Sequence, residues 1–345
     1  MNNKKIILLL LAIIFMIIAF IGYSIYSKIY TVNTTEKGFV YIKSNSSFND
    51  LKTEIAPLLK NKEDFEWVAE KKKFTKPKAG KYQIEEGMNN NELVNLLRSG
   101  KQIPVNLTFN NQHTLEDLAG RISKQIEADS ISLLNAFTDE DFLNVIQFKK
   151  EQVLGIFIPN SYQINWNTSA GKFRNRMYKE YRKFWNNDRI LKAKELGLGV
   201  NEVIALASIV QKETAKESER STVAGLYLNR LKEKWPLQAD PTIIYAMKQK
   251  YGQDFEMRRV LFKNIEDVKE SPYNTYKKQG LPPSLIAMPD ISSINAVLNP
   301  KKHDYFYMCA SVNNIGSHEF AKTLAQHNLN RTKFINKKNK QGITQ

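Results

Sequence analysis

The sequence has little cysteine: Cys309 is the only one among 345 residues. A single thiol cannot form an intramolecular disulfide, which excludes a disulfide-stabilised secreted scaffold and a metal cluster built on cysteines. Histidine is also sparse, with four widely spaced copies (His113, His303, His318 and His327), and no HExxH motif is present. The sequence therefore contains none of these familiar metal-binding patterns.

Acidic residues are in the minority. The chain has 35 Asp and Glu against 51 Lys and Arg, which gives a net charge of +16. Such an excess is compatible with binding to nucleic acid, to an anionic membrane surface or to an acidic polymer. The positive charge is spread along the chain in pairs such as Lys149-Lys150 and Lys337-Lys338. This spread favours a generally lysine-rich composition, with a surface that faces anionic lipid as the main alternative.

Long hydrophobic runs are absent except for one. Residues 6–27 carry no charge and are mostly Ile, Leu, Phe, Met or Ala. About 20 helical residues cross a hydrocarbon core of about 30 Å. The run is too long for the apolar region of a signal peptide, no A-x-A cleavage site follows it, and it lacks the polar stripe of a soluble helix. We expect an uncleaved, single-pass anchor in the inner (plasma) membrane, with residues 1–5 as a cytoplasmic tail and the rest on the periplasmic side.

The remainder has the composition of a globular protein, with 42% hydrophobic and 25% charged residues in the whole chain. Its length predicts two domains at about 150 residues each. Residues 28–38 are interpreted as a polar linker and residues 39–102 as a small module, in which a strand, a turn and an amphipathic helix occur twice. Such a module suits carbohydrate binding or a plain spacer. Residues 103–338 form the larger domain, and residues 339–345 are a tail. The fold class expected is α+β.

An aromatic stretch, "GIFIPNSYQINWNT", lies in the larger domain and includes Phe157, Tyr162 and Trp166. Exposed aromatic rings stack on sugars, but buried aromatic side chains are commoner. Core packing is therefore the preferred interpretation of this stretch.

Residues 201–213 carry the clearest chemical signal. Asn201 is a candidate helix cap, and Val203, Leu206 and Val210 follow at positions i, i+3 and i+7 of one helical face. Glu213 is the next residue on that face. A carboxyl group among apolar side chains has a raised pKa, which a general acid at neutral pH requires. The alternative is a solvated glutamate at the point where the helix leaves the core.

One carboxyl group is enough for one class of glycan chemistry. Ordinary glycosidases use two carboxylates. A lytic transglycosylase uses its glutamate first to protonate the glycosidic oxygen and then to deprotonate the C6 hydroxyl of the sugar, which closes an anhydro ring. Asp240 is a second carboxylate candidate, although "ADPT" is also typical of an Asp-Pro turn.

Several long motifs carry a family resemblance. They are "LASIVQKETAKESERSTVAGLYLNRL", "PLQADPTIIYA", "SPYNTYKKQGLPPSLIAMPD" and "HEFAKTLAQHN", in this order. The chain resembles the endolytic murein transglycosylase family, the YceG-like group, over nearly its whole length. The resemblance implies a bitopic membrane enzyme that cuts nascent peptidoglycan strands internally and needs no cofactor or metal. It also implies a LysM-like module at residues 39–102 and cell-wall synthases as partners.

The resemblance assigns the catalytic role to Glu213, the glutamate of "KET". It implies a set of substrate-binding residues in the later motifs: Gln238, Asp240, Thr242, Tyr273, Asn274, Thr275, Tyr276, His318, His327 and Asn328. The "GLPP" motif, residues 280–283, is interpreted as a rigid turn.

The sequence also departs from the family pattern. Gln211 stands where many relatives carry an acidic residue, which removes a like charge that would raise the pKa of Glu213. Ser284, Met288 and Asp290 differ from the residues usual at their positions, and these differences could alter sugar subsites without touching the chemistry.

Three alternatives to a transglycosylase remain. The first is a non-catalytic peptidoglycan-binding or scaffold protein that acts through its LysM-like region. The second is a muramidase that uses water and requires a further carboxylate, Asp240 being the first candidate. The third, nucleic-acid binding, has only the net charge in its favour and conflicts with an extracytoplasmic domain, so no nucleic-acid partner is expected.

Overall fold

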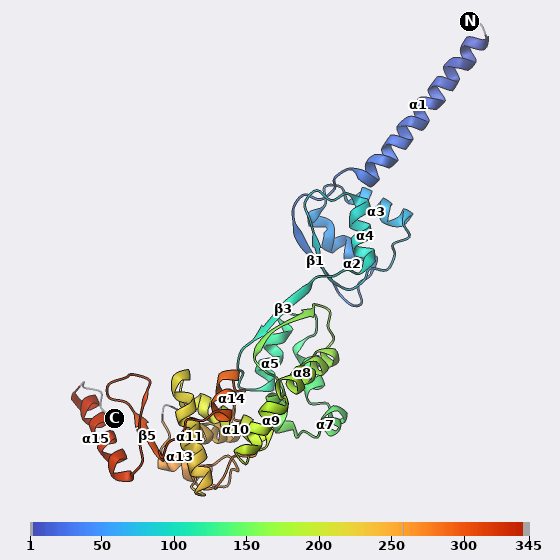
Figure 1. Cartoon of the computed structure of the whole chain (residues 1–345). Coiled ribbons are helices and arrows are strands. Elements are labelled where there is room, and N and C mark those ends of the chain that lie inside the picture. Colours follow the sequence, from blue (N-terminus) through green and yellow to red (C-terminus); the bar gives the residue numbers. More distant parts are fainter. Residues whose placement is uncertain (1–2, 258, 341–345) are drawn as a thin grey trace. The chain divides into compact units, whose positions relative to one another are not determined.

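The computed structural model describes residues 3–257 and 259–340. It combines helices with three two-stranded sheets, so the predicted α+β class is confirmed. The chain divides into two compact units (Figure 1). The first comprises residues 1–107, 123–128 and 162–169, and the second comprises residues 108–122, 129–161 and 170–345.

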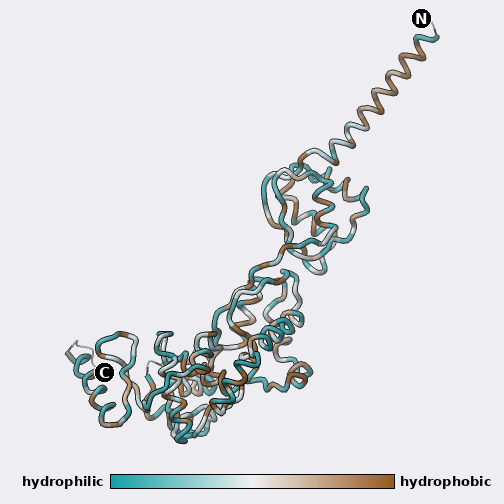
Figure 2. The backbone as a smooth tube through the Cα atoms, in the orientation of Figure 1, coloured by the Kyte–Doolittle hydropathy of each residue, from teal (hydrophilic) through white to brown (hydrophobic). Residues whose placement is uncertain are grey.

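The first unit begins with the apolar helix α1 (Asn3–Tyr30). An 18-residue window of this helix has a mean hydropathy of 3.1, and none of that window is buried. Figure 2 shows it as a nearly continuous hydrophobic rod. The helix is therefore long and apolar enough to cross a membrane, and it extends a few residues beyond the predicted run at both ends.

A small α/β module follows α1. Strands β1 (Gly38–Ile42) and β2 (Gly80–Ile84) pair antiparallel, with Val40 opposite Tyr82. The helices of the module are α2 (Phe48–Ile55), η1 (Ala56–Leu58), α3 (Lys62–Lys71) and α4 (Asn90–Ser99).

Local sequence explains the ends of these helices. Ser47 with Asp50, and Asn89 with Glu92, form reciprocal capping boxes at the starts of α2 and α4. Gly100, at φ +75°, ends α4 in the left-handed conformation that favours glycine. The predicted repeat of strand, turn and helix is present, since β1 is followed by α2 and β2 is followed by α4.

Residues 32–35, in the middle of the stretch interpreted as a linker (residues 28–38), are hydrogen-bonded into this module. Val32 and Thr34 form isolated bridges with Asn89 and Leu59. Asn33 and Thr34 are buried, with 4% and 1% of their surfaces exposed. Buried polar groups need partners, and here the module supplies them, so these residues continue its fold.

The second unit carries most of the helices. In chain order they are α5 (Leu115–Ser123), α6 (Ser130–Phe137), α7 (Glu140–Ile146), η2 (Lys150–Ile156), α8 (Ala170–Phe184), α9 (Asn187–Glu195), α10 (Val200–Glu213), α11 (Glu217–Lys232), α12 (Asp240–Tyr251), α13 (Phe262–Asp267), α14 (Ile291–Leu298) and α15 (Leu324–Lys340). Strands β3 (Pro104–Phe109) and β4 (Asn160–Asn165) pair with each other, as do β5 (Tyr307–Ala310) and β6 (His318–Ala321).

Helix α10 lies at the centre of the second unit and contacts α11, α12 and α14. Every residue from Val203 to Val210 is buried, so the helix packs on all sides rather than through one stripe. Its cap also differs from the prediction. Gly199 is the N-cap residue, and its N–H donates to Glu202, whereas Asn201 already lies inside the helix.

Gly225 explains how the chain passes close to α11. A Cβ atom at this position would lie 2.4 Å from the carbonyl oxygen of Lys301. Only glycine admits that approach. It allows the 301–305 segment to bind α11, where Asn229 donates to the carbonyl oxygens of His303 and Tyr305.

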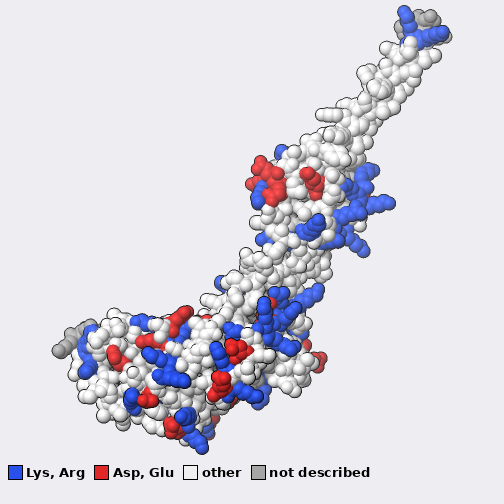
Figure 3. Space-filling view, in the orientation of Figure 1, with Lys and Arg blue, Asp and Glu red and all other residues white. Residues whose placement is uncertain are grey.

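The aromatic stretch is largely core. Phe157 and Tyr162 are 2% and 8% exposed, and the ring of Phe157 lies 4.6 Å from that of Phe137. Charged side chains of both signs are interspersed over the visible face of the second unit (Figure 3). The positive excess is thus not gathered into one patch on that face.

Candidate active site

Glu213 is the last residue of α10 and is only partly exposed. Its Oε1 accepts a hydrogen bond of 2.7 Å from the hydroxyl of Tyr227 on α11. Residues 203–210 of α10 are buried. The helix therefore places the carboxyl group of Glu213 where α10 leaves the buried core.

The surroundings of Glu213 raise its pKa from 4.5 to about 7. Burial is the main cause, because it disfavours the charged form. The negative charge of Asp240 acts in the same direction, whereas the Tyr227 hydrogen bond and the positive charge of Arg230 oppose it. A carboxyl group with this pKa is present in both protonation states near neutral pH, as a residue that must act as acid and then as base requires.

Arg230 is a buried cation on α11, 8% exposed. Its Nε donates 2.8 Å to the carbonyl oxygen of Phe306, and its Nη1 donates to the carbonyl oxygen of Leu237. These bonds fasten α11 both to the segment before β5 and to the turn before Asp240. Arg230 therefore contributes to the electrostatics of the site and to its framework.

Asp240 is exposed and begins α12, with Pro241 in the first turn. Its Oδ1 accepts a hydrogen bond of 2.5 Å from the hydroxyl of Tyr276. The "ADPT" motif is thus the start of a helix, where proline is well tolerated, rather than a free turn. Burial raises the pKa of Tyr276 above its usual value, and the adjacent Asp240 carboxylate adds to the effect, so the phenol remains a donor.

The "LQADPT" and "YNTY" motifs meet, as the predicted site requires. The N–H of Gln238 donates to the carbonyl oxygen of Thr275, and the N–H of Ala239 donates to its hydroxyl. The hydroxyls of Thr242 and Thr275 lie 2.8 Å apart. Gln238 itself is exposed and adopts a positive φ of +50°.

Four of the predicted substrate-binding residues are buried within this junction. Asn274 is 0% exposed, and its amide donates to the carbonyl oxygens of Ile265 and Val268. The Tyr273 ring packs 4.7 Å from that of Tyr245. With Thr242 and Thr275 they support the wall on which Asp240 and Tyr276 stand.

The predicted residues of the C-terminal motif lie around β6 and α15. His318 binds Glu219 through its N–H and, at 3.1 Å, through Nδ1. Glu219 also accepts from Thr214, the residue after Glu213, which connects His318 to the end of α10. His327 stacks on Tyr307. Asn328 is exposed on α15, and no contact to Glu213 is shown for it.

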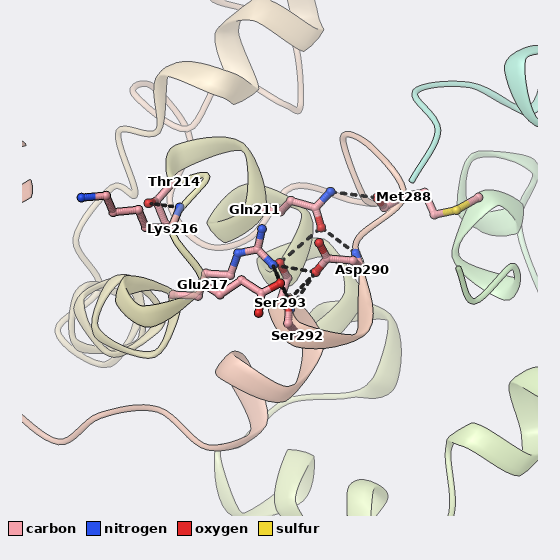
Figure 4. A network of polar contacts seen from close by, with 9 residues as sticks. Gln211, Thr214, Lys216, Glu217, Met288, Asp290, Ser292 and Ser293 are labelled. Carbon is pink, nitrogen blue, oxygen red and sulfur yellow. Dashed lines mark hydrogen bonds and ion pairs between the residues drawn. The ribbon is translucent and has the colours of Figure 1, made fainter. Parts of the chain in front are cut away.

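Gln211 fastens the 288–293 segment to α10 (Figure 4). Its Oε1 accepts from the N–H of Asp290 at 2.5 Å and from the Ser293 hydroxyl at 3.2 Å. The Asp290 carboxylate in turn pairs with Arg220 at 2.8 Å. The neutral side-chain amide of Gln211 thus accepts a hydrogen bond from the backbone N–H of Asp290. The negatively charged group of this segment is the Asp290 carboxylate.

Sequence reasoning missed Tyr227 and Arg230. Both stand in the quoted motif "AGLYLNRL", but their roles depend on how α11 crosses α10. Among the residues that the structure describes, no group of three His, Cys, Asp or Glu side chains could hold a metal ion.

Comparison with known proteins gives a consistent family match. The model of the YceG-like family matches residues 40–333. A curated Bacillus subtilis protein named endolytic murein transglycosylase is 30% identical over 300 residues, which cover 82% of this chain and 80% of that protein. A Streptococcus pneumoniae protein of the same name is 29% identical over 87% of this chain, and the match spans 58% of that longer relative. A crystal structure of a yceG-like protein from Listeria monocytogenes superposes with a TM-score of 0.56 at 28% identity, covering 85% of this chain and 98% of that one.

Proposed function

The chain belongs to the YceG-like family, and from this membership and the geometry around Glu213 we propose that it is a membrane-anchored endolytic peptidoglycan lytic transglycosylase. The observation that carries the proposal is the partly buried Glu213, with a pKa raised to about 7 and one oxygen held by Tyr227. The relatives' printed name, endolytic murein transglycosylase, gives the substrate class. The reaction class is that of a lyase acting on a polysaccharide.

The proposed reaction uses Glu213 twice. Its protonated carboxyl group donates a proton to the glycosidic oxygen as the C1–O bond of N-acetylmuramic acid breaks. The C6 hydroxyl of the same sugar then bonds to C1, and its proton passes to the Glu213 carboxylate. The product has a 1,6-anhydro end, Glu213 is again protonated, and no water is consumed.

The residues around Glu213 divide between substrate contact and support. We assign contact to the exposed or partly exposed Gln238, Asp240, Tyr276 and His318, whose polar groups suit sugar hydroxyl and N-acetyl groups. Thr242, Tyr273, Asn274 and Thr275 are buried and hydrogen-bonded or ring-packed, so their proposed role is to shape the wall. His327 and Asn328 are proposed to act at its periphery.

The first unit is proposed to place this chemistry at the membrane. Helix α1 would be the single-pass anchor, with its N-terminus in the cytoplasm and the remaining chain in the periplasm. The β1–α2–α3–β2 arrangement, two helices between paired strands, supports a LysM-like module that holds glycan strands. Cell-wall synthases are the proposed partners, since shortening of nascent strands has to occur where strands are made.

Product analysis tests the proposal directly. Full-length protein in detergent micelles, wild type beside Glu213→Gln, is incubated with purified uncrosslinked glycan strands, and the fragments are identified by mass spectrometry. We expect internal fragments with 1,6-anhydro ends from the wild type and none from the variant. The full chain is preferred to a truncation at residue 30 because Ile29 packs on the module core and Asn90 binds the carbonyl oxygen of Lys28.

Two other results would replace the proposal. Fragments with reducing ends would indicate a muramidase that activates water, and Asp240 would become the second carboxylate. Strand binding without cleavage, in the presence of membranes and synthase as well, would indicate a binding or scaffold protein.

A further inference from the structure

A basic pocket lies beside the candidate active site in the second unit. It has a volume of about 260 Å³, and its basic lining residues, among those the structure describes, are Lys212, Lys248 and His113. The remaining walls include Pro241, Ile244 and Ile286. An adjoining hollow of about 390 Å³ shares His113, Tyr245 and Gln253 with it.

Two of these lining residues are chain neighbours of the candidate catalytic carboxylates. Lys212 precedes Glu213, and Pro241 follows Asp240. Successive residues of a helix point about 100° apart, so the pocket lies next to the position of the glycosidic bond rather than at it. A group that branches from a glycan backbone could enter there while the sugars stay near Glu213.

The three basic groups are crowded. Lys212 Nζ lies 3.3 Å from Nδ1 of His113 and 3.5 Å from its Nε2. Burial lowers the pKa of Lys212, and the charge of Lys248 lowers it further. Burial together with both lysines lowers the pKa of His113, while Asp117 acts in the opposite direction.

The repulsion between Lys212 and Lys248 is not offset by an acidic side chain among the described residues that line the pocket. Neither Lys212 nor Lys248 forms an ion pair with any residue that the structure describes. The nearby acidic residues Glu116 and Glu151 line the adjoining hollow instead. An incoming anion would relieve the repulsion and gain charge-assisted hydrogen bonds.

We propose that this pocket binds a carboxylate of the peptide branches carried by the glycan strand, with Lys248 and Lys212 as its cationic contacts and Ile244 and Ile286 against a neighbouring alkyl side chain. The inference rests on the proposed function for the identity of the ligand. In a peptidoglycan strand the N-acetylated sugars are neutral, and the free carboxylates belong to the peptides. The enzyme thereby distinguishes strands with free peptide carboxylates from strands whose peptide carboxylates are amidated.

Binding to two kinds of strand tests the inference without relying on turnover. Full-length protein carrying Glu213→Gln, in detergent micelles, is titrated with fluorescently labelled uncrosslinked strands, either intact or with their peptide carboxylates converted to amides by a carbodiimide and ammonia. We expect strands with free peptide carboxylates to bind about tenfold more tightly, the effect of one good charge-assisted contact. Adding Lys248→Gln should reduce that ratio to about twofold or less, and Lys248→Arg should restore most of it.

Lys232→Gln is the matched control, because Lys232 is an exposed lysine at the end of α11 outside the pocket. It should keep the full ratio, and circular dichroism should show every variant folded. Two results would overturn the inference. The first is equal affinity of the Glu213→Gln protein for both kinds of strand. The second is an affinity ratio that stays unchanged when Lys248→Gln is added.

The experiments distinguish failure of the proposed transglycosylase activity from failure of the proposed pocket. Anhydro-ended products from wild-type protein together with equal affinities would reject the pocket and leave the transglycosylase standing. A ratio that depends on Lys248 in a protein that cleaves neither strand would establish the pocket and reject the enzyme.

Discussion

The hydroxyl of Tyr227 and Oε1 of Glu213 are joined by a hydrogen bond of 2.7 Å between helices α11 and α10. Burial and the nearby Glu213 charge raise the pKa of Tyr227 well above its usual value, so the phenol is always the donor. A carboxyl group that accepts through Oε1 carries its own proton on Oε2. In the proposed reaction the pair thus fixes which oxygen of Glu213 exchanges protons with the substrate.

Replacing Tyr227 with phenylalanine should make Glu213 a weaker acid. The hydrogen bond favours the carboxylate form and lowers the pKa, so its loss raises the pKa, by about one unit for a bond to a charged group. Because the first step needs protonated Glu213, kcat/KM falls as pH rises through this pKa. The alkaline limb of the pH profile of kcat/KM for strand cleavage should therefore move up by about one unit in Tyr227→Phe.

Tyr251→Phe is the control for that experiment. Tyr251 also donates its hydroxyl to a carboxylate, that of Asp267, but at the exposed far end of α12. Its profile should match the wild type. An unchanged limb in Tyr227→Phe would show that Tyr227 does not set the protonation of the catalytic group.

Asp240→Asn should move the same limb in the opposite direction. The negative charge of Asp240 raises the pKa of Glu213, and its removal should lower that pKa by about half a unit, since Asp240 is exposed and solvent screens it. Anhydro-ended products should still form, because the proposed reaction needs one carboxyl group. Complete loss of cleavage, with the fold intact, would favour the muramidase instead.

The position of Glu213 at the end of a buried helix was predictable from the sequence because Val203, Leu206 and Val210 set the phase of that helix. The same pattern understated the packing, since α10 is buried on every side from Val203 to Val210. The strand around Tyr82 and the stop at Gly100 were also predictable, because alternation and a helix-ending glycine are local signals.

Tyr227 and Arg230 were not predictable in the same way. Tyr227 lies 14 residues from its partner Glu213, and nothing in the local pattern says which face of α11 meets α10. The contacts of residues 32–35 within the expected linker were not predictable for a related reason. Asn33 and Thr34 look like solvent-exposed residues in sequence, but bridges to residues 59 and 89 bury them.

The raised pKa of Glu213 also makes a prediction about stability. Its pKa is about 7 in the folded protein against 4.5 ordinarily, so the folded state binds the proton more tightly. Its contribution is fully present below pH 4.5 and is lost as pH rises through 7. At about 1.4 kcal/mol per unit, the wild type should lose roughly 3 kcal/mol relative to Glu213→Gln between these limits.

Hydrogen exchange of peptides from α10 and α11 measures this difference for the second unit alone. The two proteins should exchange alike at pH 4, once rates are corrected for intrinsic pH dependence, and Glu213→Gln should be the better protected at pH 8. Equal protection at both values would mean that Glu213 is solvated and has an ordinary pKa.

Asn33 provides the corresponding test for the first unit. Its amide donates to the carbonyl oxygen of Asn61 and to Oδ1 of Asn90, and its Oδ1 accepts from the N–H of Asn61. Asn90 in turn donates to the carbonyl oxygen of Lys28 at the end of α1. Asn33→Ala leaves buried groups unpaired, which should cost about 2–3 kcal/mol.

The loss should be local, because these bonds join the end of α1 to the module and touch nothing in α10 or α11. Hydrogen exchange should therefore increase in α3 and α4 of Asn33→Ala and stay unchanged around Glu213. Asn45→Ala, in the exposed turn before α2, should exchange like the wild type. If Asn33→Ala also matched the wild type, residues 31–35 would be a free linker after all, and α1 would be joined to the module by a flexible tether instead of a fixed connection.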